Sequence, residues 1–215
     1  MRNLGLKLVA TPDEWRWCKA AWTEHHYLHS AIDPRCRPIA YIVEVDGQRR
    51  GALGFGRPES TRCNGWYGGV DDVAQGRARL TRWELINLAR VWLDPRIQPS
   101  GAEAIHNAGS QAISLALGRV ALDYLCVHPP CFLDEPYALK QCISYCDTAT
   151  HKGVIYRAAN FKLMRTNDRG LQTWMRPLRG LMPHERLQIQ LASNADMRAR
   201  RFRAQRNQLS FSLSI

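Results

Sequence analysis

The sequence lacks several features that would assign it at once to a common class of protein. No apolar run approaches the roughly 20 residues that cross a bilayer, so no membrane span is expected. None of the seven cysteines forms a CxxC pair, the close spacing that zinc sites normally use. Reduced, mostly buried thiols are expected, and Cys126 and Cys131, which flank "VHPP", are the one pair singled out as a candidate for a joint role. Internal repeats are also missing, which excludes a solenoid.

Acidic residues are scarce compared with basic ones. Thirty Lys and Arg face 19 Asp and Glu, a formal charge of +11 over 215 residues. Arginine strongly outnumbers lysine, and its planar guanidinium can bind two phosphate oxygens at once. The charge predicts a polyanionic partner, nucleic acid first, with a merely solvated basic surface as the alternative. Asp13 and Glu14 come too early for a signal peptide, so a cytoplasmic protein is expected.

The N-terminal half predicts a strand, a helix and a hairpin. Thr11 and Glu14 form a capping box around Pro12, which starts a helix expected to run to about Leu28. Asp-Gly at 46–47, between two runs of strand formers, is a strong hairpin signal. Residues 58–82 are polar and rich in glycine, as expected of a loop.

The sequence after residue 82 predicts strands at 84–93 and 138–147, a short helix at 151–160, and a last hairpin at 161–176. Between the two strands a long helix is expected over 100–125, and its buried positions are Ile105, Ile113, Leu117, Val120 and Leu125. This order predicts an α/β (α+β) fold with a mixed central sheet and helices on both faces. Residues 1–180 would form the domain, and 181–215 a basic helical tail.

A histidine-rich stretch, "EHHYLHS", ends the first predicted helix. His26 lies one turn beyond Trp22 on the inward face, whereas His25 and His29 lie on the opposite face and are expected to meet solvent. Taken alone, a histidine in this position is more often a hydrogen-bonded core residue than a functional one.

The stretch "SYCDTATHKGVIYRAANFKL", residues 144–163, adds a family resemblance. It resembles the strand-to-helix signature of the Mom-type DNA-modification proteins of phage Mu and their relatives, divergent members of the GNAT acyltransferase superfamily. Proteins of the Druantia antiphage system are similar too, with a His-Tyr-Leu motif upstream of a Gly-Trp loop, as in "HHYLH" and "NGWYG" here. The resemblance covers roughly residues 20–178, and it implies a GNAT-like fold.

The resemblance also implies an active site made of His26, Tyr27, Asp147 and Tyr156. Iron has been proposed for such sites, and one imidazole, one carboxylate and two phenols suit Fe(II). The same groups suit acid and base roles around an amine. From the residues alone, Asp147 could instead cap a turn, and Tyr156 could belong to the core.

Acetyl-CoA is the cofactor that the resemblance implies. GNAT enzymes hold its pyrophosphate at a glycine-rich helix start, and the segment "IHNAGSQAIS" takes that place with an incomplete glycine pattern. Asn107, Gly109 and Ser110 are the candidate phosphate contacts, with an ordinary helix start as the alternative. Arg90, on the preceding strand, would position a phosphate or lie on the surface.

The activity implied is transfer of an acetyl-CoA-derived, carbamoylmethyl-type group to the N6 amine of adenine in DNA, which shields the DNA from restriction. Such a protein would be encoded by a phage or mobile element and act in a bacterial host. The base must leave the stack, and Trp66 and Tyr67 are candidates to hold it. Basic residues of the tail would track phosphates, namely Arg198, Arg200, Arg201 and Arg203.

The residues leave two other functions open. One is a DNA-binding defence or mobile-element protein without transferase activity, and the other is a GNAT N-acetyltransferase of a small amine or a protein. The basic tail argues against the second, and the four candidate active-site residues argue for chemistry over binding alone. The tail could also dock on a partner subunit, and its ending "LSFSLSI" could add a strand to a neighbouring sheet in a homodimer.

Overall fold

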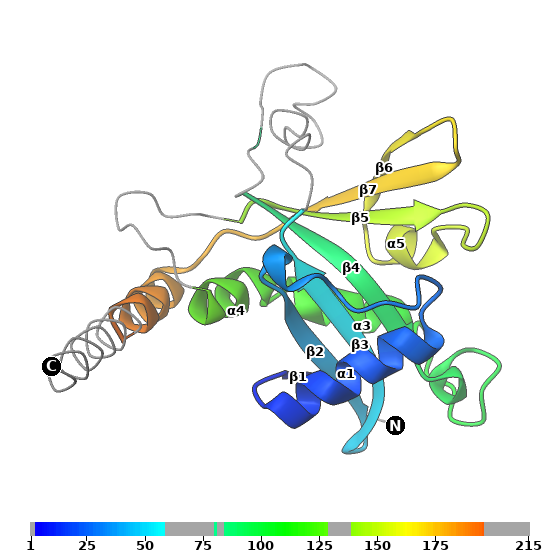
Figure 1. The fold of residues 1–215 in the computed structure, drawn as a ribbon, viewed down its shortest axis with the longest axis horizontal. Coiled ribbons are helices and arrows are strands. Elements are labelled where there is room, and N and C mark those ends of the chain that lie inside the picture. The colour runs from blue at the N-terminus through cyan, green and yellow to red at the C-terminus, as the bar shows by residue number, and fades with distance from the viewer. Residues whose placement is uncertain (1–2, 59–79, 81–83, 129–138, 196–215) are drawn as a thin grey trace, which may run out of the picture.

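The chain forms one seven-stranded sheet in the order β1-β2-β3-β4-β5-β7-β6 (Figure 1). The computed structural model describes residues 3–58, 80, 84–128 and 139–195. The strands are β1 (Leu4–Leu8), β2 (Ile39–Val45), β3 (Gln48–Gly56), β4 (Leu85–Leu93), β5 (Gln141–Asp147), β6 (Lys162–Thr166) and β7 (Leu171–Pro177).

Helices cover both faces of this sheet. Helix α1 (Pro12–His25) crosses one face, whereas α3 (Ala108–Leu117) and α4 (Val120–Val127) lie on the other, and α5 (Val154–Ala158) follows β5 (Figure 1). Two short 3-10 turns, η1 (Pro34–Cys36) and η4 (Pro95–Ile97), complete the described elements. The α/β fold expected from the sequence, a mixed sheet with helices on both faces, is confirmed.

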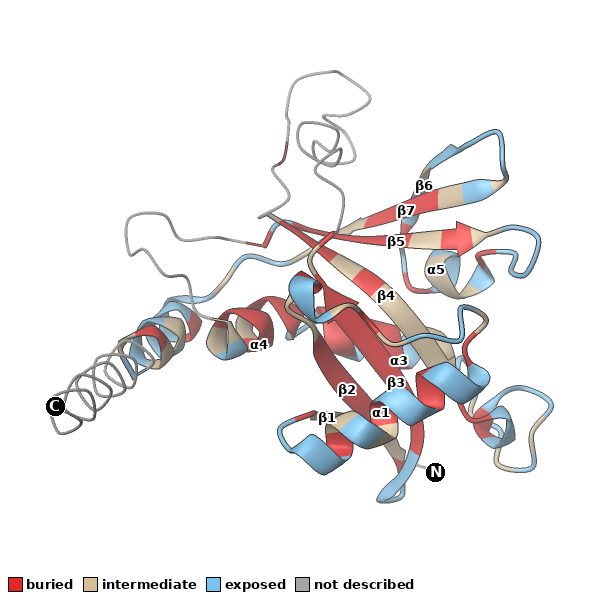
Figure 2. Cartoon of the chain, viewed as in Figure 1, coloured by how far each residue is buried: buried red, intermediate tan, exposed pale blue. Residues whose placement is uncertain are grey.

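The core is divided between the two faces of the sheet (Figure 2). On the α1 face, Cys18 and Trp22 are fully buried against Ala40, Ile42 and Ala52 of the central strands. The larger cluster lies on the α3–α4 face and includes the side chains predicted at 113, 117, 120 and 125. In the described part of the chain Cys18, Cys36, Cys126, Cys142 and Cys146 are free thiols, and four of them are buried.

Local signals place the first elements as expected. The Thr11 hydroxyl accepts the Glu14 amide while Glu14 accepts the Thr11 amide, so the predicted capping box is present. Asp46 and Gly47 both have positive φ, 50° and 77°, as a tight turn between paired strands requires.

Two helix boundaries differ from the prediction. Helix α1 ends at His25 because His26 is already extended, with φ −85° and ψ 138°. The long helix expected over 100–125 begins only at Ala108, and it is divided into α3 and α4 at Gly118 and Arg119. Glycine is a poor helix former, and ion pairs hold the segment before Ala108 in turns.

A fork opens in the middle of the sheet. Strands β4 and β5 are parallel, whereas the other neighbouring strands pair antiparallel. The pairing between β4 and β5 covers only Leu85–Asn87 against Gln141–Ile143. One step further, the Ser144 hydroxyl donates to the Leu88 carbonyl at 2.8 Å. Beyond that bridge the strands diverge, as Figure 1 shows. Both strands therefore present backbone groups to the gap between them.

The C-terminal segment is helical over 183–195, in line with the predicted tail helix. Its first turn is fixed by Glu185, which is buried, ion-paired with Arg179, and accepts the Met182 amide. The tail arginines Arg198, Arg200, Arg201 and Arg203 lie outside the described residues, as do Trp66 and Tyr67. No helix among the described residues is long and apolar enough to cross a membrane.

Candidate functional site

A cavity of about 480 Å³ fills the fork between β4 and β5. Strand β4 contributes Val91 and Leu93, β5 contributes Tyr145 and Cys146, and the first turn of α3 closes one end. The segment after α1 and the segment from β5 to α5 supply the polar side chains, namely His26, Tyr27, His151, Lys152 and Tyr156. Segments more than a hundred residues apart thus meet at one opening of the sheet.

The start of α3 presents amide groups to this cavity. Asn107, the N-cap residue, has a left-handed backbone conformation with φ 55°, and its side chain makes no capping hydrogen bond to the helix. Among the described residues, the amides of Gly109 and Ser110 have no hydrogen-bond acceptor, as is usual for a first helical turn. A Cβ on Gly109 would come within 2.5 Å of Ile155 Cδ1, so glycine allows α3 to approach α5 closely. The arrangement can bind an anion.

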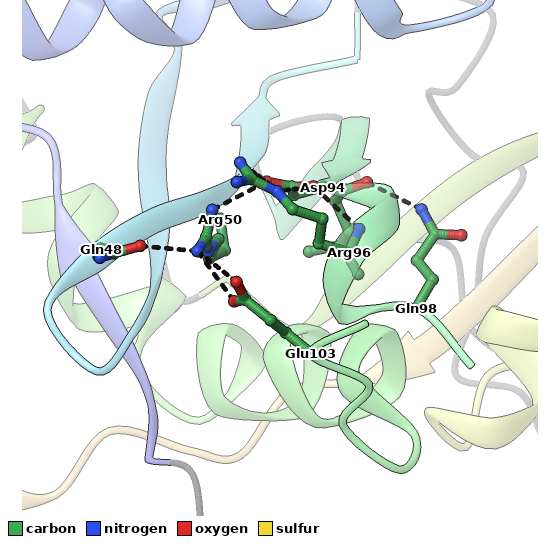
Figure 3. Close-up of polar contacts among 7 residues, drawn as sticks. Gln48, Arg50, Asp94, Arg96, Gln98 and Glu103 are labelled. Atoms are coloured by element: carbon green, nitrogen blue, oxygen red, sulfur yellow. Dashed lines mark hydrogen bonds and ion pairs between the residues drawn. The ribbon is translucent and has the colours of Figure 1, made fainter. Parts of the chain in front are cut away.

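A buried ion network fixes the loop that leads from β4 to α3 (Figure 3). The Arg50 guanidinium bridges Asp94, at 3.3 Å, and Glu103, at 2.9 Å. Both carboxylate oxygens of Asp94 also accept hydrogen bonds from the Arg96 guanidinium, and this hydrogen bonding lowers the pKa of Asp94. The Gln98 amide donates to the Leu93 carbonyl at 2.8 Å. These contacts hold residues 94–103 outside an α-helix, with only the short 3-10 turn η4 among them, before α3 begins at Ala108.

His26 is buried, with 7% exposure, and its ring belongs to the wall of the cavity. Its Nδ1 lies 3.2 Å from the Leu28 amide, which donates to it. A neutral imidazole with Nδ1 accepting carries its proton on Nε2. Burial, with a smaller effect of the Arg90 charge, lowers the pKa of His26 to about 4. At neutral pH His26 is therefore an uncharged hydrogen-bond donor.

The two tyrosines of the predicted set both line the cavity. Tyr27 lies between two imidazoles, with ring centroids 4.5 Å from His26 and 5.3 Å from His151. Burial raises the pKa of Tyr27, and it raises the pKa of Tyr156 to about 12. Both phenols are thus protonated at neutral pH and act as neutral polar groups.

Asp147 stands at the end of β5 but does not line the cavity. Its carboxylate accepts the Ala149 amide at 2.9 Å, and its carbonyl accepts the amides of Thr150 and His151. This is the turn-capping role that the sequence left open. Asp147 therefore shapes the loop that carries His151.

Iron does not fit these residues. Within the described ranges, no three His, Cys, Asp or Glu side chains are grouped so as to hold a metal ion. Of the four predicted ligands, Asp147 is engaged in its own turn, and burial keeps the Tyr156 phenol protonated by raising its pKa. The remaining pair, His26 and Tyr27, offers too few ligands for a metal centre.

Arg90 does not line the cavity into which the start of α3 opens. Its guanidinium donates to the carbonyls of Ser30 and Ala31 and to the Ser30 hydroxyl, so it fastens the loop after α1 to β4. Asn107, Gly109 and Ser110, the other predicted cofactor contacts, do line the cavity.

Among the cavity-wall residues that sequence reasoning did not assign to the site are Tyr145, Cys146 and His151. The sequence indicates Cys146 only as part of a strand, since alternation cannot reveal that a strand borders a fork. Tyr145 stands in the stretch 144–163 that carries the family resemblance, and so does His151. His151 is exposed and lines the cavity beside Tyr27.

No protein-family model matches the chain, and no curated protein matches it. Among solved structures it is similar to aminoglycoside acetyltransferase AAC(6')-Ib in complex with coenzyme A, at 10% identity and TM-score 0.48, covering 81% of this chain and 95% of the other. It is also similar to Campylobacter jejuni N-acetyltransferase PseH in complex with acetyl coenzyme A, at 13% identity and TM-score 0.42, covering 81% and 99%. At these values the likeness assigns neither an acceptor nor a catalytic residue to this chain.

Proposed function

We propose that the chain is an acyl-CoA-dependent transferase that modifies the exocyclic amine of adenine in DNA. The observation that supports an acyl-CoA-dependent transferase is the fork between β4 and β5, with the first turn of α3 at its end. The choice of adenine in DNA as the acceptor rests on the resemblance to Mom-type proteins and on the charge of +11.

The fork suits a CoA thioester. The arm of CoA contains amide groups, which can pair with the strand edges beyond Leu88 and Ser144 as another strand would. Its pyrophosphate would meet the unpaired amides of Gly109 and Ser110, where the positive end of the helix dipole favours an anion. The thioester then lies near the middle of the sheet, beside Tyr145 and Cys146.

The neighbouring side chains supply the roles that acyl transfer needs. The amine nitrogen attacks the thioester carbonyl, a C–N bond forms, the C–S bond breaks, and the CoA thiolate leaves with the electron pair. The Nε2–H of His26 would donate to the developing oxyanion, since its other nitrogen accepts the Leu28 amide. The exposed imidazole of His151 would take the proton that the amine loses and pass it to the thiolate.

Nucleoside mass spectrometry tests this proposal on DNA from cells that express the protein. We expect a new adenine-derived nucleoside whose added mass identifies the group transferred. His151→Ala should reduce its formation by about 10²- to 10⁴-fold, the usual contribution of a general acid–base residue. His184→Ala, a change in the C-terminal segment away from the cavity lining, is the matched control and should leave it unchanged.

Unmodified DNA from well-folded, well-expressed protein would overturn the proposal and favour DNA binding without transfer. Acylation of free amines or proteins with DNA unmodified would instead favour an ordinary N-acetyltransferase.

A further inference from the structure

A second cavity, of about 400 Å³, lies next to the fork. The loop after α1 contributes Leu28 and Ile32 to its walls, and the end of β3 contributes Gly56. Strand β4 contributes Asn87 and Arg90. Tyr145 belongs to the walls of both cavities. A molecule in the second cavity would thus lie beside the place where the thioester is expected.

Asn87 is the last β4 residue paired with β5, and its side chain borders the second cavity. Its amide oxygen is buried, and within the described part of the chain it has no hydrogen-bond donor. Buried polar atoms nearly always have a partner, so this acceptor in a cavity wall is a point where a ligand with a hydrogen-bond donor can bind. A primary amide offers this acceptor next to a donor NH₂ group.

The rest of the wall suits a flat ring attached to a phosphate chain. Leu28 and Ile32 offer apolar surface, and Tyr145 offers an aromatic ring. The hydrogen bonds of Arg90 to Ser30 and Ala31 fix the loop that carries this apolar surface. Arg57 and Arg90 place two positive charges in the same wall, which favours an anionic ligand.

We propose that the second cavity receives the adenine ring of an extruded nucleotide, and that Asn87 is the residue that selects it. The paired acceptor and donor of an amide match the amine and the adjacent ring nitrogen of adenine. The amine would donate one hydrogen to Asn87 and keep its lone pair for the thioester beyond Tyr145. This inference rests on the proposed function for its substrate, but it concerns binding and can be tested without transfer.

The experiment measures binding of the full chain to two fluorescent single-stranded oligonucleotides in the absence of any acyl donor. They differ at one position, which carries adenine in one and purine, the same ring without the amine, in the other. Wild type should prefer adenine by up to about 10-fold, because purine lacks the donor of one of the two hydrogen bonds. Asn87→Leu should abolish the preference, and its affinity for the adenine oligonucleotide should fall by more than its affinity for the purine oligonucleotide.

Ile32→Val is the matched control, because it alters the same wall without a polar group; it should retain the preference. Asn87→Ala removes the same acceptor with a smaller side chain, so it should also abolish the preference if Asn87→Leu fails to fold. No adenine preference in wild type, or a preference that survives both Asn87 variants, would overturn the assignment. If the protein modifies DNA and substitution of Asn87 does not change this activity, the proposed function stands and the adenine site is wrong. If the adenine preference depends on Asn87 but no group is transferred, the adenine site stands and the proposed function is wrong.

Discussion

At the scale of single residues, burial decides what the candidate groups can do. His26 lies in a loop that buries it and gives its Nδ1 a backbone donor, so it is neutral and offers Nε2–H. Burial also raises the pKa of Tyr27 and Tyr156, which keeps both phenols protonated. Of the histidines and tyrosines in the cavity wall, His151 is the exposed one. The proton acceptor and the oxyanion donor are therefore different histidines.

His26 should make the protein sensitive to mild acid. Its pKa is about 4 in the folded chain against an ordinary 6.5, so the unfolded chain binds the proton first as pH falls. Stability is fully present above about pH 6.5 and is lost between pH 6.5 and 4, by at most about 3 kcal/mol. Urea unfolding at several pH values measures this loss. The His26→Gln variant should lose less stability than wild type between about pH 6.5 and 4. An equal loss of stability in the two proteins would contradict the burial of a neutral imidazole.

The sequence predicts part of this site for a physical reason. Helical spacing from Trp22 places His26 inward, and the resemblance adds Tyr27 and Tyr156, all of which reach the cavity. Spacing cannot show which strand edges lack a partner, so it does not reveal Tyr145 and Cys146. Nor can it show that the guanidinium of Arg90 is taken up by carbonyl oxygens of a distant loop.

At the scale of elements, the predictions are confirmed where a local signal is complete. The Thr11–Glu14 capping box and the Asp46–Gly47 turn specify their geometry within a few residues, and both are present. The helix expected over 100–125 is wrong in its first part, which contacts from elsewhere hold in turns. Arg50 of β3 binds Asp94 and Glu103, which follow it by 44 and 53 residues. Apolar periodicity contains no information about such an ion network.

Removing Arg50 should therefore cost far more than removing a surface arginine. Its side chain is 8% exposed, and it faces two carboxylates. Arg50→Met would leave both without this partner and should lower the free energy of unfolding by about 3 kcal/mol. Arg16→Met breaks an exposed pair with Asp13 and should cost less than about 1 kcal/mol. Equal midpoints in urea for the two variants would show that the network does not hold the loop.

At the scale of the whole molecule, charge and the fork have separate roles. The fork provides a place for a thioester, whereas the excess of arginine would bring a polyanion to it from any direction. Residues 196–215 contain five arginines and one aspartate. The helical segment before them is anchored by Glu185 and Arg179, so the two parts can be separated by deletion.

Deleting residues 196–215 should weaken DNA binding and flatten its dependence on salt. Each phosphate that an arginine neutralises adds about 0.9 to the magnitude of the slope of log K against log salt, so without the five arginines this magnitude should fall by up to about 4.5. Fluorescence anisotropy at several salt concentrations measures the slope. Deleting only 209–215, which contain no arginine, is the control and should keep it. A slope unchanged by the longer deletion would assign the tail to another partner.

The most direct test of the account is calorimetric titration of CoA into the purified chain. Val91 lines the fork, so Val91→Trp would fill it, whereas Val127→Trp places the same ring on the exposed surface of α4. We predict saturable binding to wild type and to Val127→Trp, and none to a folded Val91→Trp variant. Absence of CoA binding by folded wild type, or equal binding by all three proteins, would contradict the claim that the fork is a thioester site.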